Sequence, residues 1–233
     1  MAEEVDLFNG TTNSNWERFS LLDKGNANWS ISNGVMEFTA SGTLNDEQVF
    51  VKNLLNLNNA SDWNLEIGMS NSANSQLQIF ISSGANNFSD YFGVTLKSFG
   101  TSSSNIWGAE KPGHQYWGNN GITAIAGQQG SIKIDYVSST GTYTLFYANG
   151  GIDPISDKYT YSLLHSYTTL ERGNVNLYVG LNTDDGIAGN EYQINSGEAY
   201  VDNLKIIPEP STLSLITFSL GGLIALASLR KNK

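Results

Sequence analysis

The chain contains no cysteine, which excludes disulfide bonds, thiolate zinc sites and cysteine nucleophiles. A chain of 233 residues can bury an adequate core without cross-links, so this absence is compatible with an exported protein. Lysine and arginine are also scarce, at 12 against 22 aspartates and glutamates, and the net charge is −10. Because phosphate binding requires clustered basic side chains, we expect no nucleic-acid partner.

Charged residues make up only 15% of the chain, and no convincing amphipathic helix occurs before residue 208. Glycine, serine, threonine and asparagine are abundant, a composition that favours turn-rich β structure. Apolar and polar residues alternate along many short segments, as in half-buried strands. The segments that we predict as strands are 29–39, 47–52, 63–69, 76–82, 90–97, 132–136, 143–147, 160–168, 175–181 and 198–207.

Turn signals separate several of these segments. Asn33-Gly34 predicts a tight turn between two strands, and Ser138-Ser139-Thr140-Gly141 predicts a hairpin turn between 132–136 and 143–147. About twelve strands with such turns are typical of a sandwich or jelly roll. We therefore predict one all-β domain over residues 5–207.

The C-terminal segment 208–233 differs from the rest of the chain. It begins with Pro208-Glu209-Pro210, continues without charge over 211–229, and then carries Arg230 and Lys231. A helix that rises about 1.5 Å per residue over this uncharged stretch would approach the thickness of a bilayer core. The pattern predicts one C-terminal transmembrane helix, with the basic residues on the cytoplasmic side.

This order of tripeptide, apolar span and basic terminus resembles the PEP-CTERM sorting signal of exported bacterial proteins. The resemblance implies an exosortase partner that processes the tail, transient membrane anchoring before processing, and delivery to the cell surface or extracellular matrix. An ordinary C-terminal anchor helix is the alternative. Residues 1–4 are acidic and polar rather than a secretion signal, and we interpret them as the remnant of a processed or missing N-terminus.

Local patterns follow one another in a fixed order across residues 5–207. They are Asp6-Leu7-Phe8-Asn9-Gly10, Trp16, the run 28–37, Phe50-Val51-Lys52, the run 61–67, Val175 to Leu181, and 199–206. In this order they resemble the concanavalin A-like lectin and glucanase superfamily, especially its laminin G-like and 3-keto-disaccharide hydrolase-like branch. The resemblance implies a jelly roll of two curved antiparallel sheets that binds sugars on its concave face or at its loop rim. The first and last strands should pair.

Catalytic chemistry is thinly represented. Glucanases of this superfamily carry a Glu-x-Asp-x-x-Glu cluster on one strand, which aligns carboxylates on one face, and this sequence has none. Asp184-Asp185 predicts a solvated turn, with a metal site as the alternative. His165 lies in a predicted strand, where a structural role is expected. We therefore predict a protein that is not an enzyme.

The segment from Phe99 to Gln129 is the best candidate for ligand binding, because long loops on a β scaffold often carry function. Aromatic faces stack on sugar rings, and polar side chains add directional hydrogen bonds. The alternative is that the tryptophans are buried and pin the loop to the sandwich. The candidate ligand-binding residues are Tyr91, Trp107, His114, Tyr116 and Trp117.

A structural calcium ion is a further implication of the superfamily resemblance. Asp6 and Asp202 are the matching carboxylates near the first and last strands, and calcium prefers such oxygen ligands. The alternative for Asp202 is that it caps an edge turn.

Taken together, these patterns predict an exported surface or matrix protein whose jelly roll binds a carbohydrate or matrix polymer without catalysis. Two alternatives remain open. One is a purely structural or adhesive matrix protein, and the other is a glycoside-processing enzyme of the 3-keto-disaccharide hydrolase-like type.

Overall fold

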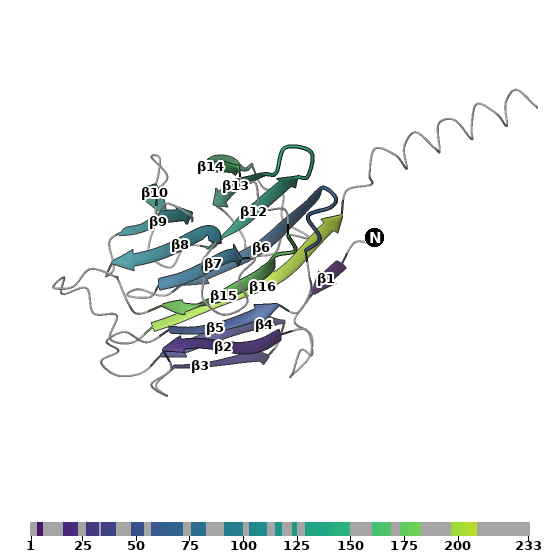
Figure 1. Ribbon diagram of the computed structural model, residues 1–233. Coiled ribbons are helices and arrows are strands. Elements are labelled where there is room, and N and C mark those ends of the chain that lie inside the picture. The colour runs from purple at the N-terminus through teal and green to yellow at the C-terminus, as the bar shows by residue number, and fades with distance from the viewer. Residues whose placement is uncertain are drawn as a thin grey trace, which may run out of the picture.

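The computed structural model describes residues 4–6, 16–22, 27–32, 34–40, 48–53, 57–71, 76–82, 91–99, 103–110, 115–117, 123–124, 129–149, 160–168, 173–182 and 197–208. These residues form two eight-stranded sheets that lie one over the other (Figure 1). Every strand pair is antiparallel, so the predicted all-β sandwich of two antiparallel sheets is confirmed.

The strands of each sheet come from distant parts of the sequence. Sheet A runs β14 (Ser162–Thr168), β13 (Thr142–Asn149), β12 (Gln129–Val137), β6 (Trp63–Asn71), β16 (Gly197–Pro208), β4 (Val35–Ala40) and β3 (Ala27–Ser32), with β1 (Glu4–Asp6) beside β16. Sheet B runs β10 (Gln115–Trp117), β9 (Ser103–Glu110), β8 (Tyr91–Phe99), β7 (Gln76–Ser82), β15 (Asn176–Asn182), β5 (Gln48–Asn53) and β2 (Trp16–Leu22), with β11 (Thr123–Ala124) beside β9.

Most of the strands expected from alternation are present. The pairing of β1 with β16 confirms that the first and last strands meet. The segment from Phe99 to Gln129 was expected to be a loop, and this is corrected, because its described parts include β9, β10 and β11. Strand β9 begins with Ser103, Ser104 and Asn105, which do not alternate between apolar and polar residues. The sequence pattern therefore does not predict this strand, and its pairing with β8 reveals it.

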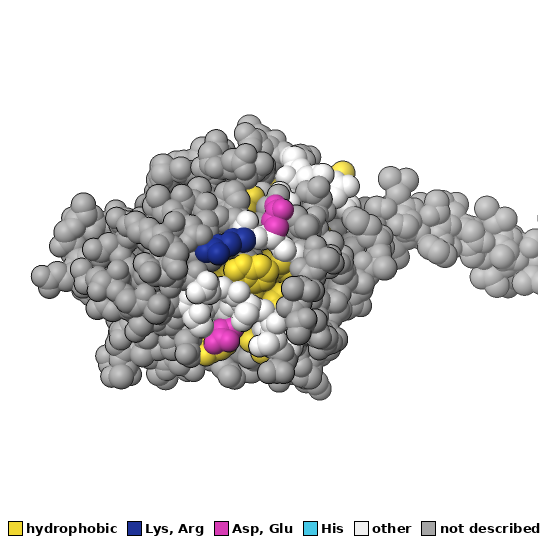
Figure 2. Space-filling view, turned by 90° about the horizontal axis from the view of Figure 1, so that it is seen from below, with side chains coloured by type: hydrophobic (Ala, Val, Ile, Leu, Met, Phe, Trp, Pro, Cys, Tyr) yellow, Lys and Arg dark blue, Asp and Glu magenta, His cyan; other side chains and the backbone are white. Residues whose placement is uncertain are grey.

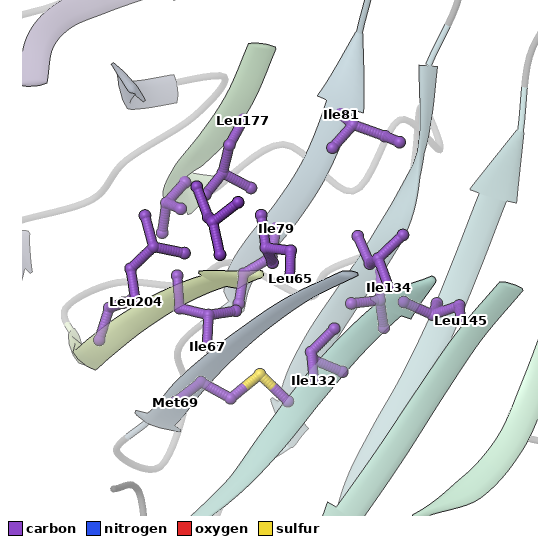
Figure 3. Packing of buried hydrophobic residues seen from close by; sticks show 14 of the residues in the cluster. Leu65, Ile67, Met69, Ile79, Ile81, Ile132, Ile134, Leu145, Leu177 and Leu204 are labelled. Carbon is purple, nitrogen blue, oxygen red and sulfur yellow. The ribbon is translucent and has the colours of Figure 1, made fainter. Parts of the chain in front are cut away.

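The core lies between the two sheets (Figure 3). Leu65, Ile67 and Met69 of β6 are almost completely buried, and Ile79 and Ile81 approach them from β7 of the other sheet. Because successive side chains of a strand point to opposite faces, the polar residues between them lie on the outer faces. The alternation predicted for β6, β12 and β13 is therefore confirmed.

Two glycines with positive φ close the predicted turns. Gly34 has φ 80° and precedes β4, and Gly141 has φ 68° at the end of the β12–β13 hairpin turn. The amide of Gly141 donates to the carbonyl of Val137 at 2.8 Å. Glycine adopts this backbone conformation without the steric cost that a Cβ would add.

Strands β2 and β3 end the two sheets on the same side of the sandwich. Trp16 is buried there, and Trp29 packs partly buried against the core. Figure 2 shows the molecule from this side, where described basic and acidic side chains lie beside hydrophobic ones. The exposed Glu17 and Arg18 belong to β2. Trp16 and Trp29 thus cover the core at the edge strands of the two sheets.

Strand β16 runs to Pro208, so the sandwich extends up to the start of the predicted sorting signal. Glu209, Pro210, Arg230 and Lys231, together with the predicted helix over 211–229, lie outside the described residues. Among the residues that the structure does describe, no helix is long and apolar enough to cross a membrane.

Candidate functional site

The outer face of sheet B is the face turned away from sheet A. Phe92 and Val94 of β8 are buried in the core, with 1% and 4% of their surface exposed. Gly93 lies between them in sequence and therefore falls on the outer face. Because paired residues of an antiparallel ladder share a face, the strand register extends this assignment across the sheet.

One row of paired residues crosses most of this face. Tyr116 of β10 pairs with Ala109 of β9, Ala109 pairs with Gly93 of β8, and Gly93 pairs with Phe80 of β7. Phe80 pairs in turn with Tyr178 of β15. No register shift interrupts these ladders. The row thus places aromatic positions on both sides of two small residues.

The register separates the predicted ligand-binding residues. Trp107 stands two residues before Ala109, and Tyr91 two residues before Gly93, so both share the outer face with Tyr116. Trp117 pairs with Gly108 and falls on the opposite face, which turns toward the core. The side chains of these four aromatic residues, and all of His114, lie outside the described part of the structure.

The described side chains of this face form a buried aromatic pair. The rings of Phe80 and Tyr178 stack with their centroids 5.1 Å apart and their planes 7° from parallel. Phe80 exposes 8% of its surface and Tyr178 none. Burial raises the pKa of Tyr178, and the charge of Glu17 raises it further, so the phenol stays neutral. Because both rings are buried, the outer face of sheet B is covered over β7 and β15.

Gly93 is required for the close approach of Phe80. A Cβ atom built on Gly93 would lie 2.2 Å from Phe80 Cβ and 2.4 Å from the carbonyl oxygen of Ile79. Any side chain at this position would displace backbone as well as the ring. Glycine therefore determines where the aromatic pair lies relative to β8.

The outer-face positions of described strands β7 to β11 and β15 include no Asp or Glu, and the charged residue among them is Lys97. Uncharged hydrogen-bonding residues and aromatic residues occupy most of the others. This combination suits a ligand that offers hydroxyl groups and an apolar ring face. The uncharged polar residues are Gln76, Gln78, Ser82, Thr95, Ser103, Asn105, Thr123, Asn176 and Asn182.

The two predicted calcium ligands lie on paired strands. Asp6 of β1 pairs with Leu204 of β16, two residues beyond Asp202. Asp202 pairs with Val35 and Gly68. Within the described ranges, no three Asp, Glu or His residues gather into a group that could hold a metal ion. Calcium usually takes six to eight oxygen ligands, so these carboxylates would need further donors, and the calcium site stays a prediction.

Sequence reasoning missed a charged and aromatic cluster on the outer face of sheet A. Lys133 Nζ lies 3.0 Å from Asp135 Oδ2, 5.2 Å from the centre of the Phe146 ring and 5.9 Å from that of Tyr161. Glu66 pairs directly with Lys133 across β6 and β12. The alternation could have placed the strand residues together, but not Tyr161, which precedes β14 and arrives from outside the pairing.

Tyr161 holds its segment against sheet A. Its hydroxyl lies 2.9 Å from Oγ of Ser131, which is fully buried and also donates to the carbonyl of Ile67 at 3.3 Å. Burial raises the pKa of Tyr161, the Ser131 hydrogen bond acts against this, and the charges of Glu66 and Asp135 raise it further. The phenol therefore stays protonated as a hydrogen-bond donor.

Two buried side-chain oxygen atoms of the same region accept no hydrogen bond. Asn64 Oδ1 and Asp135 Oδ1 are buried and accept no hydrogen bond, and their residues pair across β6 and β12. Since both oxygens are covered, neither is available to a bound ligand. The cluster on sheet A therefore holds the Tyr161 segment against the sheet.

His165 lies in β14, half buried, with its ring 6.3 Å from that of Phe92. Phe92 also stacks with Tyr143 and Tyr167, at centroid distances of 5.9 and 5.7 Å. His165 therefore borders the aromatic part of the core, as the expected structural role requires.

No protein-family model and no curated protein matches this sequence. Solved structures do match its fold. Lectin II from Ulex europaeus superposes with a TM-score of 0.58 at 10% identity, over 90% of this chain and 99% of that chain. A lectin UEA-II complexed with galactose gives 0.56 at 12% identity, over 90% and 99%. A prokaryotic beta-1,3-1,4-glucanase (lichenase) from a mouse hindgut metagenome gives 0.53 at 9% identity, over 90% and 100%.

These similarities concern the fold, since so few residues are identical. The chain shares the jelly-roll fold of these lectins and of this glucanase, so the jelly-roll part of the fold prediction is confirmed.

Proposed function

We propose that this protein is a non-catalytic carbohydrate-binding jelly roll that acts at the cell surface or in the extracellular matrix. The observation that carries the proposal is the alignment of Tyr91, Trp107 and Tyr116 on one outer face of sheet B. Sugars are commonly bound by aromatic faces together with uncharged hydrogen-bonding groups, and both are concentrated on this face. The similarity in fold to a lectin complexed with galactose supports the same conclusion.

The described outer-face positions of β7 to β11 and β15 carry no carboxylate, and this favours binding over hydrolysis. Glycosidases use a pair of Asp or Glu residues on either side of the scissile bond. The described outer-face positions of β7 to β11 and β15 offer no such pair. The glycoside-processing alternative, which the similarity to a glucanase keeps open, would need its carboxylates elsewhere.

Delivery is the second part of the proposal. The PEP-CTERM-like tail at 208–233 supports export and processing by an exosortase, with transient anchoring by the 211–229 segment. Strand β16 ends at Pro208, so cleavage beyond this residue would leave the sandwich complete. We therefore propose that the tail is a sorting signal and not a part of the binding domain.

The test is retention of the full-length chain on a glycan array and on insoluble polysaccharides. We expect retention on at least one glycan, and a loss of about tenfold or more in affinity for Trp107→Ala and for Tyr116→Ala. Trp117→Ala is the matched control. The register places Trp117 on the face toward the core, so the affinity of this variant for the glycan should change little.

The same samples distinguish the alternatives. Release of reducing sugar from a bound polymer would contradict the non-catalytic proposal and favour the glycoside-processing alternative. Failure to retain any glycan, with and without added calcium, would leave the structural or adhesive role.

A further inference from the structure

We infer that one end of the sandwich rests on phospholipid headgroups while the tail anchors the chain, and this inference rests on the proposed delivery by the tail. The end concerned is the one at which β16 leaves sheet A, and we call it the exit end. A row of directly paired residues crosses sheet A at this level, in the order β16, β6, β12, β13 and β14. The row consists of Pro208, Trp63, Tyr136, Tyr143 and Tyr167.

The exit end continues beyond this row into residues 57–62, 137–142 and 173–175. The turn between β12 and β13 lies at the same end of the sandwich as the end of β16 (Figure 1). The amide of Ser138 in this turn donates to Asp62, which precedes β6. Asn59 donates to the carbonyl of Gly173 at 2.7 Å, which brings the segment before β15 to the same place. Segments of both sheets therefore meet at the exit end.

The connection between the exit end and the predicted membrane span is short. Glu209 and Pro210 separate Pro208, the last described residue, from the uncharged stretch 211–229. Three extended residue steps reach at most about 11 Å. The headgroups occupy about 5 to 8 Å on each side of the hydrocarbon core. With 211–229 across that core, Pro208 therefore lies in the headgroup layer or directly above it, and the exit end faces the lipids.

The chemistry of the exit end suits this position. Among the described residues of 57–63, 136–143, 168 and 173–175, the charged one is Asp62, which is half buried and accepts two hydrogen bonds from Ser138. Glu4 of β1 lies farther back, where it pairs with Ile206. The exposed residues are asparagine, serine, threonine, alanine, glycine and Val137, which exposes 39% of its surface. Since a charge near the bilayer loses hydration, an uncharged end allows close contact.

This placement also orients the candidate binding face. The strands of both sheets rise from the exit end, so the outer face of sheet B is turned sideways and away from the lipids. An acidic protein of net charge −10 gains little from laying a face on a bilayer, because anionic lipids repel it. The anchored form can therefore meet a glycan before the tail is processed.

The test measures the distance of three exposed positions from the lipids. Because the chain has no cysteine, Thr168→Cys, Ser162→Cys and Asn28→Cys in the full-length chain each accept a single fluorophore. The variants are reconstituted into phosphatidylcholine vesicles that contain a lipid with a nitroxide quencher on its headgroup. Circular dichroism establishes that each variant is folded.

The label at Thr168 probes the exit end, and the other two labels are the controls. Ser162 lies about 17 Å from Thr168 along the pairing of β14 with β13. Asn28 lies at the level of Glu198, about 30 Å from Pro208 along β16. Quenching should fall in the order Thr168, Ser162, Asn28, with a difference of about twofold or more between the first and the last.

A linker variant tests whether the short connection holds the exit end at the lipids. A Gly-Ser linker of about ten residues inserted after Pro208 adds about 17 Å of r.m.s. reach. This insertion should lower the quenching of the Thr168 label toward that of the Asn28 label. Unchanged quenching in this variant would contradict the role of the short connection.

Flotation of the vesicles separates this inference from the proposed delivery. If the full-length chain does not float with the vesicles, the tail is no anchor and the proposed delivery itself falls. If the chain floats but the labels at Thr168 and Asn28 are quenched equally, the anchor stands and the exit end does not rest on the headgroups.

Discussion

Asn59 shows how much one buried polar residue can organise. Its Nδ2 donates to the Tyr143 hydroxyl at 2.6 Å and to the carbonyl of Gly173 at 2.7 Å, and its Oδ1 accepts from Trp63 Nε1 at 3.1 Å. It exposes only 2% of its surface. These bonds join the start of β6, the β13 strand and the segment before β15. Nothing in the sequence around Asn59 indicates this role, because its partners are far away in the chain.

Replacement of Asn59 by alanine should be strongly destabilising. The change removes the acceptor of the buried Trp63 indole N–H, which costs about 1 to 3 kcal/mol for an unsatisfied buried group, and it removes the amide donor of the buried Tyr143 hydroxyl. We expect a loss of about 3 kcal/mol in the free energy of unfolding, measured by urea denaturation. Asn58→Ala is the control, because Asn58 is exposed and its Oδ1 only accepts the amide of Ala60 at 2.9 Å. Equal losses for the two variants would contradict the central role of Asn59.

The β12–β13 hairpin is the clearest case at the scale of elements. Its turn is attached to the segment before β6 by Asp62, whose Oδ1 accepts from the Ser138 amide at 2.7 Å and from the Ser138 hydroxyl at 2.5 Å. The sequence predicts the hairpin itself, because apolar residues alternate on both sides of a turn that ends in glycine. It does not predict the attachment, which depends on how β6 pairs with β12.

Removal of the Asp62 carboxylate should loosen the hairpin turn. We expect Asp62→Ala to lower the free energy of unfolding by about 2 kcal/mol and to speed hydrogen exchange at the Ser138 amide. Ser138→Ala should cost less, since its backbone amide can still donate to Asp62. Unchanged exchange at Ser138 in Asp62→Ala would show that the turn is held by other contacts.

Strands β9, β10 and β11 mark the limit of prediction by pattern. Alternation identifies a strand only when one face is apolar, as in β6 and β12. In β9, the outer-face positions Ser103 and Asn105 and the inner-face Ser104 and Gly108 are polar or small, so the segment reads as a loop. Pairing with β8 makes it a strand. The pairing of β10 with β9 then puts Tyr116 on the face of Trp107 and Trp117 on the other face.

At the scale of the whole molecule, buried tyrosines link stability to alkaline pH. Burial raises the pKa of Tyr147 from 10.0 to about 12, and burial also raises the pKa of Tyr161 and Tyr178. In the unfolded chain these phenols ionise near pH 10, while in the folded protein they stay protonated. The unfolded state therefore holds fewer protons above pH 10, and stability falls as pH rises.

Chemical denaturation between pH 8 and pH 12 checks this expectation. Stability should be constant up to about pH 10 and then decline as the pH passes through the raised pKa values, with about 2 to 3 kcal/mol lost through Tyr147 alone. Tyr147→Phe should have a shallower decline above pH 10, with tyrosine absorbance followed in parallel. A wild-type curve that stays level to pH 12, or one that Tyr147→Phe leaves unchanged, would contradict the linkage.

The sequence by itself determined the class of the fold. Its alternating apolar residues, its turn glycines and its lack of helical periodicity lead to an antiparallel sandwich, because these are local properties of neighbouring residues. Only the tertiary structure decided which strands pair and in which register. Register depends on partners that are far apart in the chain, and a shift by one residue would move every side chain to the other face. The candidate site exists only at that level, where the register brings the positions of Tyr116, Trp107 and Tyr91 to one face of sheet B.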